Sequence, residues 1–161
     1  AAAQMTDTIF VLNGPNLNLL GTREPRIYGN QTLADIQATL EERAKALKLK
    51  LDVRQSNHEG VLVDWLHEAL AKASAVIFNA GAYAHTSVAI RDAVAALPIP
   101  VIEVHLTNIY AREGFRRTSL LGQVTRGSII GFGPLGYVLA LDAAAHLCKG
   151  AAANQAKSQI Q

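Results

Sequence analysis

The stretch Thr8-Ile9-Phe10-Val11-Leu12-Asn13, near the start of the chain, indicates the fold class. Its apolar residues form a continuous run rather than an alternating one, which is typical of a strand covered on both faces. The polar loop Gly14-Pro15-Asn16-Leu17-Asn18 follows at once. The same order, a short apolar run and then a polar loop, returns at Ala75-Val76-Ile77-Phe78-Asn79. We therefore predict buried strands that lie parallel in one sheet.

Short apolar runs of this kind alternate with longer helical patterns along the chain. We predict strands at Thr8–Asn13, Leu49–Gln55, Ala75–Asn79, Val101–Val104 and Ser128–Phe132. Thr32 can cap a helix whose apolar residues recur at helical spacing, namely Leu33, Ile36, Leu40, Ala44 and Leu47. Further helices are predicted at Val61–Ala71, Ser87–Ala96 and Leu135–Cys148, and Pro98 and Pro100 follow the second of these.

This alternation predicts an α/β fold with a five-stranded parallel sheet and helices on both faces. The flavodoxin-like strand order suits five strands, and a Rossmann-type half is the alternative. The 161 residues suit one domain, which we expect to span residues 5–149 as a single catalytic unit. We exclude Ala1 to Gln4 from the fold, and we expect the Ala-rich tail from Gly150 to Gln161 to be disordered.

Composition excludes several classes of protein. The net charge is only +2 and no long run of Lys or Arg occurs, so we expect no general binding of nucleic acid. A single cysteine, Cys148, permits no internal disulfide and suits a reducing cytoplasm. No apolar stretch is long enough to cross a bilayer and no secretory leader is visible. We expect a cytoplasmic protein with no membrane partner.

Polar side chains collect where the predicted strands end. Amides, imidazoles and a carboxylate occur in Asn13–Asn18, Ser56–Gly60, Asn79–Ser87 and Glu103–Asn108. Loops that merely turn the chain use Gly, Pro, Asn and Asp. Ligands of such folds bind beyond the carboxyl ends of the strands. The pattern predicts a site at this edge for a small ligand rich in hydroxyl groups.

The segment from Gly21 to Gly29, which we call the lid segment, is longer than a usual strand-to-helix connection. It carries Arg23 and Tyr28 between glycines, which favours an active-site lid. A free tyrosine has a pKa of about 10, but a neighbouring arginine favours the phenolate, and a phenolate can remove a proton beside a carbonyl. The alternative is a surface loop, and the segment alone does not decide between the two.

Glu103 and His105 lie two apart on a predicted strand and therefore face the same side. The carboxylate can orient the imidazole and favour its protonated form, which is a good acid for a departing hydroxyl. A structural histidine is the alternative. Asn16, Asn79 and His85 can hold hydroxyls or a water, although asparagines after strands often only cap turns. The charged run with Arg112, Arg116 and Arg117 is either a solvated face or a grip for a substrate carboxylate.

Other chemistries lack their motifs. No Gly-x-Gly-x-x-Gly and no phosphate-binding Gly-Lys-Ser/Thr loop is present, and no Cys/His spacing suggests a metal. The lysines lie outside the strand-end motifs, which argues against a Schiff base.

The ordered set of motifs resembles the type II 3-dehydroquinate dehydratases of the shikimate or quinate pathway. It comprises Leu12–Gly21, Arg23-Glu24-Pro25 through Tyr28-Gly29, Gln55–Gly60, Asn79–Tyr83 and Glu103-Val104-His105, and the match runs from about Ile9 to about Leu147.

That resemblance implies a flavodoxin-like subunit that removes water from 3-dehydroquinate by anti elimination through an enolate, without cofactor, metal or Schiff base. It makes Tyr28 the base, Arg23 the cation that aids it, and His105 the acid oriented by Glu103. Asn16 is implied to hold a water against the enolate oxygen, and Arg112 to stabilise the lid indirectly. The implied substrate-binding residues are Asn79, His85, Leu106, Thr107 and Arg116, with Asp92 supplied by a neighbouring subunit. The assembly is implied to be a dodecamer of trimers.

Two positions depart from the family pattern. Many relatives have Ser where this chain has Thr107, which keeps the hydroxyl and adds a methyl, and many have another residue at Arg26. Two other functions compete with the resemblance. A flavin or nucleotide module would need phosphate-cradling Gly, Ser and Thr in the first loop, which instead holds Pro15 and three Asn. An RNA-binding Arg patch explains neither the lid segment nor the Glu103 and His105 pair.

Overall fold

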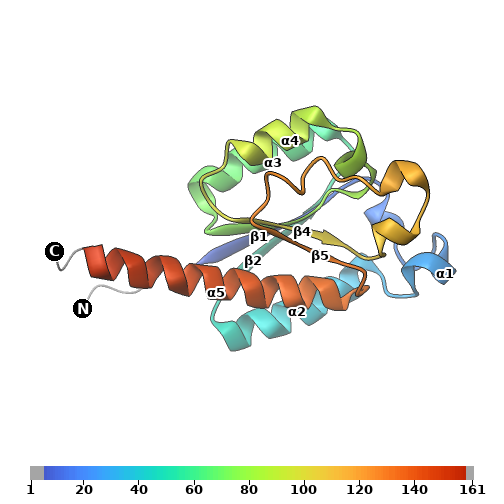
Figure 1. The fold of residues 1–161 in the computed structure, drawn as a ribbon. Coiled ribbons are helices and arrows are strands. Elements are labelled where there is room, and N and C mark those ends of the chain that lie inside the picture. The colour runs from blue at the N-terminus through green and yellow to red at the C-terminus, as the bar shows by residue number, and fades with distance from the viewer. Residues whose placement is uncertain (1–5, 159–161) are drawn as a thin grey trace.

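A computed structural model describes residues 6–158 of the chain. Five parallel strands form one sheet between two layers of helices (Figure 1). The strands are β1 (Thr8–Asn13), β2 (Lys50–Gln55), β3 (Ala75–Asn79), β4 (Val101–His105) and β5 (Gly127–Ile130). Their spatial order is β2-β1-β3-β4-β5, which is the flavodoxin-like order. The predicted fold class is confirmed.

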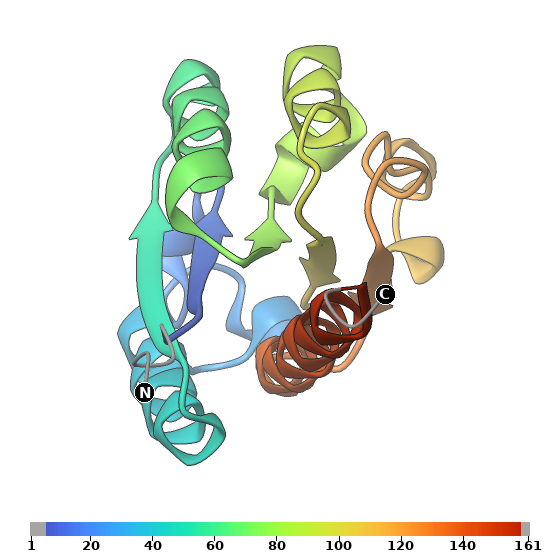
Figure 2. The same cartoon turned by 90° about the vertical axis from the view of Figure 1, so that its left-hand side faces the viewer.

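Helices cover both faces of the sheet (Figure 2). Helices α2 (Leu33–Leu47) and α5 (Leu135–Ser158) pack on one face, against one buried side of β1, β3 and β4. Helices α3 (Glu59–Lys72) and α4 (Val88–Ala95) pack on the other face. Because apolar residues on both sides of the same strands are buried, these strands show the continuous apolar runs seen in the sequence.

Short elements gather beyond the carboxyl ends of the strands. They are the helix α1 (Pro25–Tyr28) and the 3-10 helices η1 (Leu17–Leu19), η2 (Gly81–His85), η3 (Ile109–Ala111) and η4 (Gly114–Arg116). Figure 1 shows α1 at this end of the molecule and the last turns of α5 at the opposite end. The apolar core therefore lies on the two faces of the sheet, and the loops lie beyond the carboxyl ends of its strands.

Local sequence explains where the helices begin. Thr32 and Asp35 form a capping box, in which each side chain accepts a hydrogen bond from the backbone N–H of the other residue. Ser87 caps α4 by accepting a hydrogen bond from the N–H of Ile90.

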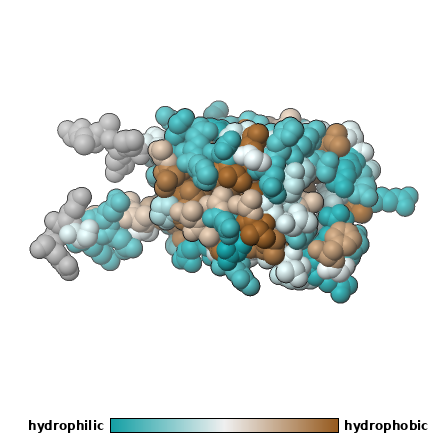
Figure 3. Space-filling model, turned by 90° about the horizontal axis from the view of Figure 1, so that it is seen from above, coloured by the Kyte–Doolittle hydropathy of each residue, from teal (hydrophilic) through white to brown (hydrophobic). Residues whose placement is uncertain are grey.

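The outer surface over α3 and α4 mixes apolar patches with hydrophilic side chains (Figure 3).

The C-terminal helix is longer than the sequence led us to expect. We predicted its end at Cys148 and disorder from Gly150, but α5 continues to Ser158. Residues 151–158 are exposed, so packing does not hold this extension. Alanine has the highest helix propensity, and Ala151, Ala152 and Ala153 carry the helix past Gly150. The division of the chain at Lys149 stays a prediction, and residues 1–5 and 159–161 lie outside the described part.

Candidate active site

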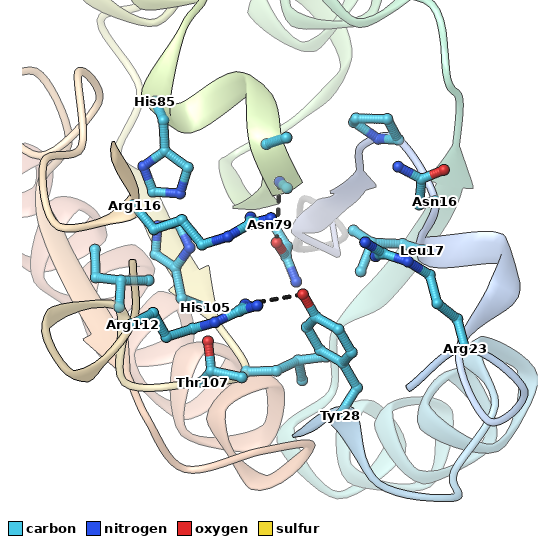
Figure 4. A pocket seen from close by; sticks show the side chains of 15 residues that line it. Asn16, Leu17, Arg23, Tyr28, Asn79, His85, His105, Thr107, Arg112 and Arg116 are labelled. Carbon is cyan, nitrogen blue, oxygen red and sulfur yellow. Dashed lines mark hydrogen bonds between the residues drawn. The ribbon is translucent and has the colours of Figure 1, made fainter. Parts of the chain in front are cut away.

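A pocket of about 180 Å³ opens at the carboxyl edge of the sheet (Figure 4). This volume is below the roughly 300–1,000 Å³ of sites for drug-sized ligands, so the pocket suits a small molecule. Its lining includes nine of the eleven residues that we expected at a site: Asn16, Arg23, Tyr28, Asn79, His85, His105, Leu106, Thr107 and Arg116. Glu103 lies behind His105, and Asp92 lies elsewhere. The sequence thus predicted the place of the pocket and most of its lining.

The lid segment carries Tyr28 into the pocket from the end of α1. Arg112 Nη1 donates a hydrogen bond of 2.8 Å to the hydroxyl oxygen of Tyr28, as Figure 4 shows. The Arg23 guanidinium carbon lies 5.4 Å from the centre of the Tyr28 ring, and that of Arg112 lies 5.3 Å from it. We expected Arg23 to be the cation beside the phenol and gave Arg112 an indirect role. In the structure both guanidinium groups lie near the Tyr28 ring, and Arg112 is the one that donates a hydrogen bond to the hydroxyl oxygen of Tyr28.

Glu103 and His105 form a buried pair at the end of β4. His105 Nε2 lies 2.9 Å from Glu103 Oε2, and both side chains are almost fully buried. Because a carboxylate only accepts, Nε2 carries the hydrogen of this bond. Burial by itself raises the pKa of the Glu103 carboxyl, but the hydrogen bonds from His105, Ser119 and Ser128 outweigh burial and lower it. The carboxylate therefore stays ionised and fixes the orientation of the imidazole.

Two serines complete the shell of Glu103 and were missed in the sequence. Ser128 Oγ donates to Glu103 Oε1 at 2.8 Å, and Ser119 Oγ donates to Oε2. Ser128 lies directly opposite Glu103 in the pairing of β4 with β5. Strand pairing was the signal that could have identified Ser128. Ser119 lies in an irregular loop between η4 and β5, where no periodicity predicts its position.

His85 enters the pocket from η2 beside His105, with the two ring centres 6.0 Å apart. Its Nδ1 lies 2.8 Å from the carbonyl oxygen of Thr118, so Nδ1 is the nitrogen that donates. Burial lowers the pKa of His85, although the bond to Thr118 opposes this shift. The neutral ring therefore presents the lone pair of Nε2, which can accept a hydrogen bond from a hydroxyl.

The loops after β1 and β3 approach each other closely beneath the pocket. The N–H of Gly14 donates to the carbonyl of Asn79 at 2.8 Å, and a Cβ on Gly14 would lie 2.3 Å from the Ala80 oxygen. Only glycine fits there. Asn16 adopts a left-handed backbone with a φ of 67°, and Asn57 Oδ1 accepts a 3.0 Å hydrogen bond from its N–H. Asn57, in the loop after β2, thus holds the turn that presents Asn16.

The lining contains more positive than negative side chains. Arg23, Arg112 and Arg116 contribute guanidinium groups, and no Asp or Glu is among the described residues that line the pocket. Two glutamates outside the lining pair with these arginines: Glu24 with Arg23, and Glu113 with Arg112 and Arg116. Thr107 and Leu106 follow directly after β4, so their backbone lies at the pocket wall. An excess of guanidinium groups attracts an anion, and arginine pairs with a carboxylate through two parallel hydrogen bonds. The site therefore suits a small acid.

Asp92 does not reach this pocket within one chain. It lies on α4 with its side chain 65% exposed, and its carboxylate pairs with Arg91 at 3.0 Å.

Within residues 6–158, no group of three or more His, Cys, Asp or Glu side chains is placed to hold a metal ion. Among the helices of the same range, none is both long and apolar enough to span a membrane.

The chain is similar to known proteins over almost its whole length. The family described as Dehydroquinase class II matches residues 7–145. A Rhizobium etli protein named 3-dehydroquinate dehydratase is 59% identical over 139 residues, which cover 86% of this chain and 96% of that relative. A relative of the same name from Halalkalibacterium halodurans is 56% identical over 135 residues, covering 84% of this chain and 93% of the relative. The crystal structure of a type II dehydroquinase from Butyrivibrio crossotus superposes with a TM-score of 0.85 at 42% identity, covering 86% and 97% of the two chains.

Proposed function

The chain belongs to the class II dehydroquinase family and is a 3-dehydroquinate dehydratase, a hydro-lyase, and we propose that Tyr28 and His105 are its base and acid. The substrate is a cyclic hydroxy-ketone acid. Loss of water from it requires removal of a proton beside the ketone and departure of a hydroxyl from the neighbouring carbon. The two steps need a base and an acid at different points of one pocket.

Tyr28 supplies the base in this proposal. Its hydroxyl oxygen accepts a hydrogen bond from Arg112, and two guanidinium groups lie within 6 Å of its ring. The hydrogen bond from Arg112 orients this oxygen and stabilises negative charge on it. The phenolate takes the proton next to the ketone, and the electron pair of that C–H bond moves into an enolate. Asn16, at the pocket rim, holds a water that donates a hydrogen bond to the enolate oxygen.

His105 supplies the acid. With Nε2–H committed to Glu103, the other ring nitrogen, Nδ1, is the one that can deliver a proton into the pocket. The ionised carboxylate of Glu103 holds the ring in this orientation. When the enolate collapses, the C–O bond of the neighbouring carbon breaks and its hydroxyl leaves as water with the proton from His105. The imidazole then regains a proton, and Tyr28 releases the one it took.

The remaining polar groups orient the substrate. Arg116 and the backbone at Leu106 and Thr107 bind its carboxylate, and Thr107 keeps the hydroxyl that a serine would supply. Neutral His85 accepts a hydrogen bond from a ring hydroxyl, and Asn79 donates one. The single observation that carries the proposal is the hydrogen bond from Arg112 to Tyr28, because it gives a lid tyrosine the cation that a phenolate base needs.

An ultraviolet assay tests the proposed reaction. The product, 3-dehydroshikimate, contains a conjugated enone that the substrate lacks. Added to 3-dehydroquinate without cofactor or metal, and with a chelator present, the wild-type protein should produce this absorbance. A His105→Ala variant should produce it at a rate lower by about a hundredfold or more. A wild-type protein without activity contradicts the function, whereas a fully active His105→Ala contradicts only the assignment of the acid.

We also propose that the enzyme assembles as a dodecamer of trimers, in which Asp92 reaches the site of a neighbouring subunit. Exposed Val88 lies four residues before Asp92 on α4, so a carboxylate and an apolar side chain share one surface. Asp92→Ala should then weaken the trimer contact and raise KM together, while the subunit stays folded. Sedimentation and steady-state kinetics decide this: a variant unchanged in size and KM, or a fully active wild-type monomer, contradicts the proposal. The single cysteine supports a cytoplasmic location, which we propose with it.

A further inference from the structure

Tyr137 joins two strand ends from beneath the pocket. It lies on α5, is fully buried, and approaches the sheet from the face that α2 and α5 cover. Its hydroxyl lies 2.6 Å from Asn13 Oδ1, at the end of β1, and 2.9 Å from Asn79 Nδ2, at the end of β3. None of the proposed reaction steps uses Tyr137, although one of its two partners lines the pocket.

The hydrogens in this network can point in only one direction. Asn13 Nδ2 donates to the carbonyl oxygen of Arg54 at 3.1 Å, which turns the amide oxygen of Asn13 toward Tyr137. An amide oxygen only accepts, so the hydroxyl of Tyr137 donates to it. A hydroxyl has one hydrogen, and Tyr137 can therefore only accept from Asn79. The atom of Asn79 that faces Tyr137 must be its amide nitrogen.

The other end of the Asn79 amide agrees with this direction. The N–H of Gly81 lies 3.2 Å from Asn79 Oδ1, so a donor faces the amide oxygen. Burial raises the pKa of the Tyr137 phenol, which keeps its proton on the oxygen. Within residues 6–158, Asn79 Nδ2 makes one hydrogen bond, to Tyr137, and its second N–H remains available on a residue that lines the pocket.

We propose that Tyr137 is a positioning residue that fixes the polarity of Asn79, so that Asn79 presents an N–H and not a carbonyl oxygen to the substrate. This inference rests on the proposed function, because it assigns the recognised atom of the substrate. That atom is a hydrogen-bond acceptor, an oxygen lone pair of the hydroxy-ketone acid. Asn13, at the end of β1, accepts the hydrogen of the Tyr137 hydroxyl. The oxygen of that hydroxyl is then left to accept a hydrogen bond from Asn79, at the end of β3.

Removal of the Tyr137 hydroxyl tests whether its hydrogen bonds orient the Asn79 amide. In Tyr137→Phe the amide of Asn79 loses the partner of its nitrogen, and only the 3.2 Å hydrogen bond from the N–H of Gly81 still opposes its turning over. KM for 3-dehydroquinate should rise by roughly threefold to tenfold, the effect of one lost hydrogen bond, while kcat changes less. Leu66→Ala is the control for stability, because it opens a cavity in the core on the other face of the sheet. Leu66→Ala should lower Tm and leave KM unchanged. If the role of Tyr137 were merely structural, Tyr137→Phe would show this same result.

A double mutant separates positioning from an unrelated defect. In an Asn79→Ala background there is no amide to orient, so adding Tyr137→Phe should leave KM at the value of Asn79→Ala alone. If the two increases in KM multiply, Tyr137 does not act through Asn79 and the proposal is overturned. Asn13→Ala, which removes the acceptor of the Tyr137 hydrogen, should reproduce the rise in KM with the phenol present. A wild-type protein without dehydratase activity would instead contradict the proposed function itself.

Neutron diffraction of the wild-type protein decides the question if these variants fail to fold. The deuterium on the Tyr137 oxygen should point to Asn13, and two deuterium atoms should lie on the atom of Asn79 that faces Tyr137. A hydroxyl deuterium that points to Asn79 overturns the proposal.

Discussion

Arg112 and Tyr28, which are 84 positions apart in the chain, are joined by a 2.8 Å hydrogen bond from the guanidinium to the phenol oxygen. The bond connects the lid segment to the loop between η3 and η4. The side chain of Arg112 is only 13% exposed, and its guanidinium also lies 3.8 Å from Glu113 Oε1. The contact of the lid segment with this arginine is therefore made through the oxygen that we propose as the base.

Replacing Tyr28 by Phe should lower kcat by orders of magnitude. The substitution removes the oxygen that is proposed to take the proton and leaves the ring beside the two guanidinium groups. KM should change far less, because the loss falls on the transition state. Tyr110→Phe is the matched control, since Tyr110 is 63% exposed and outside the pocket lining. A Tyr28→Phe variant that keeps more than about a tenth of the activity refutes Tyr28 as the base.

Arg112→Met should also lower kcat strongly, since it removes the cation on the phenol oxygen while keeping an unbranched side chain. Arg112→Lys should recover only part of the loss, because an ammonium is a point charge without the planar fork of arginine. Arg126→Met, at an exposed position outside the pocket, is the control. Steady-state kinetics of the three variants test this order, and an Arg112→Met variant with wild-type kcat would contradict it.

Borohydride should not inactivate the enzyme in the presence of substrate. Within residues 6–158, no lysine lines the pocket, and imine formation needs a lysine amine at the ketone. Intact-protein mass spectrometry after treatment should show the unmodified mass and assays should show full activity. A reduced adduct on any lysine would rule out the enolate route through Tyr28.

Stability should decrease with acid in the range where His85 titrates. Burial lowers the pKa of His85 in the folded protein, while the unfolded chain keeps the ordinary value of about 6.5. The unfolded chain therefore takes up the proton first as the pH falls. The contribution of His85 is complete above about pH 6.5 and is lost as the pH falls toward the lower folded value. His85→Asn should flatten Tm between pH 7 and pH 5, and equal slopes for variant and wild type would contradict this.

The sequence predicted the sheet well because its strands are buried on both faces. The bounds of β1 and β3 agree with the predicted ranges, since Asn13 and Asn79 end uninterrupted apolar runs. The same logic placed Glu103 and His105 together, because alternate residues of a strand share a side. The lid segment stood out in the sequence by its length and glycines, and its role as a lid stays a prediction. Its contact with Arg112 joins two irregular loops, whose pairing no local pattern determines.

What the sequence could not provide depends on long-range contacts. Tyr137 has the spacing of an ordinary core residue on α5, and only the folded sheet brings its hydroxyl between Asn13 and Asn79. The extension of α5 to Ser158 follows from helix propensity, which we weighed less than the polar character of the tail. The role of Asp92 depends on a second copy of the chain and stays a prediction.

The most direct test of the acid and base assignment is the stereochemistry of elimination. Tyr28 reaches the pocket from the lid segment and His105 from the end of β4 (Figure 4). The family resemblance implies anti elimination, and we therefore propose that the proton and the hydroxyl leave from opposite faces of the ring. Deuterium is placed on the carbon between the ketone and the hydroxyl-bearing carbon, on the face opposite the leaving hydroxyl. The product should contain no deuterium, as judged by its mass. Product that retains the deuterium would show syn elimination and contradict the assignment of Tyr28 and His105.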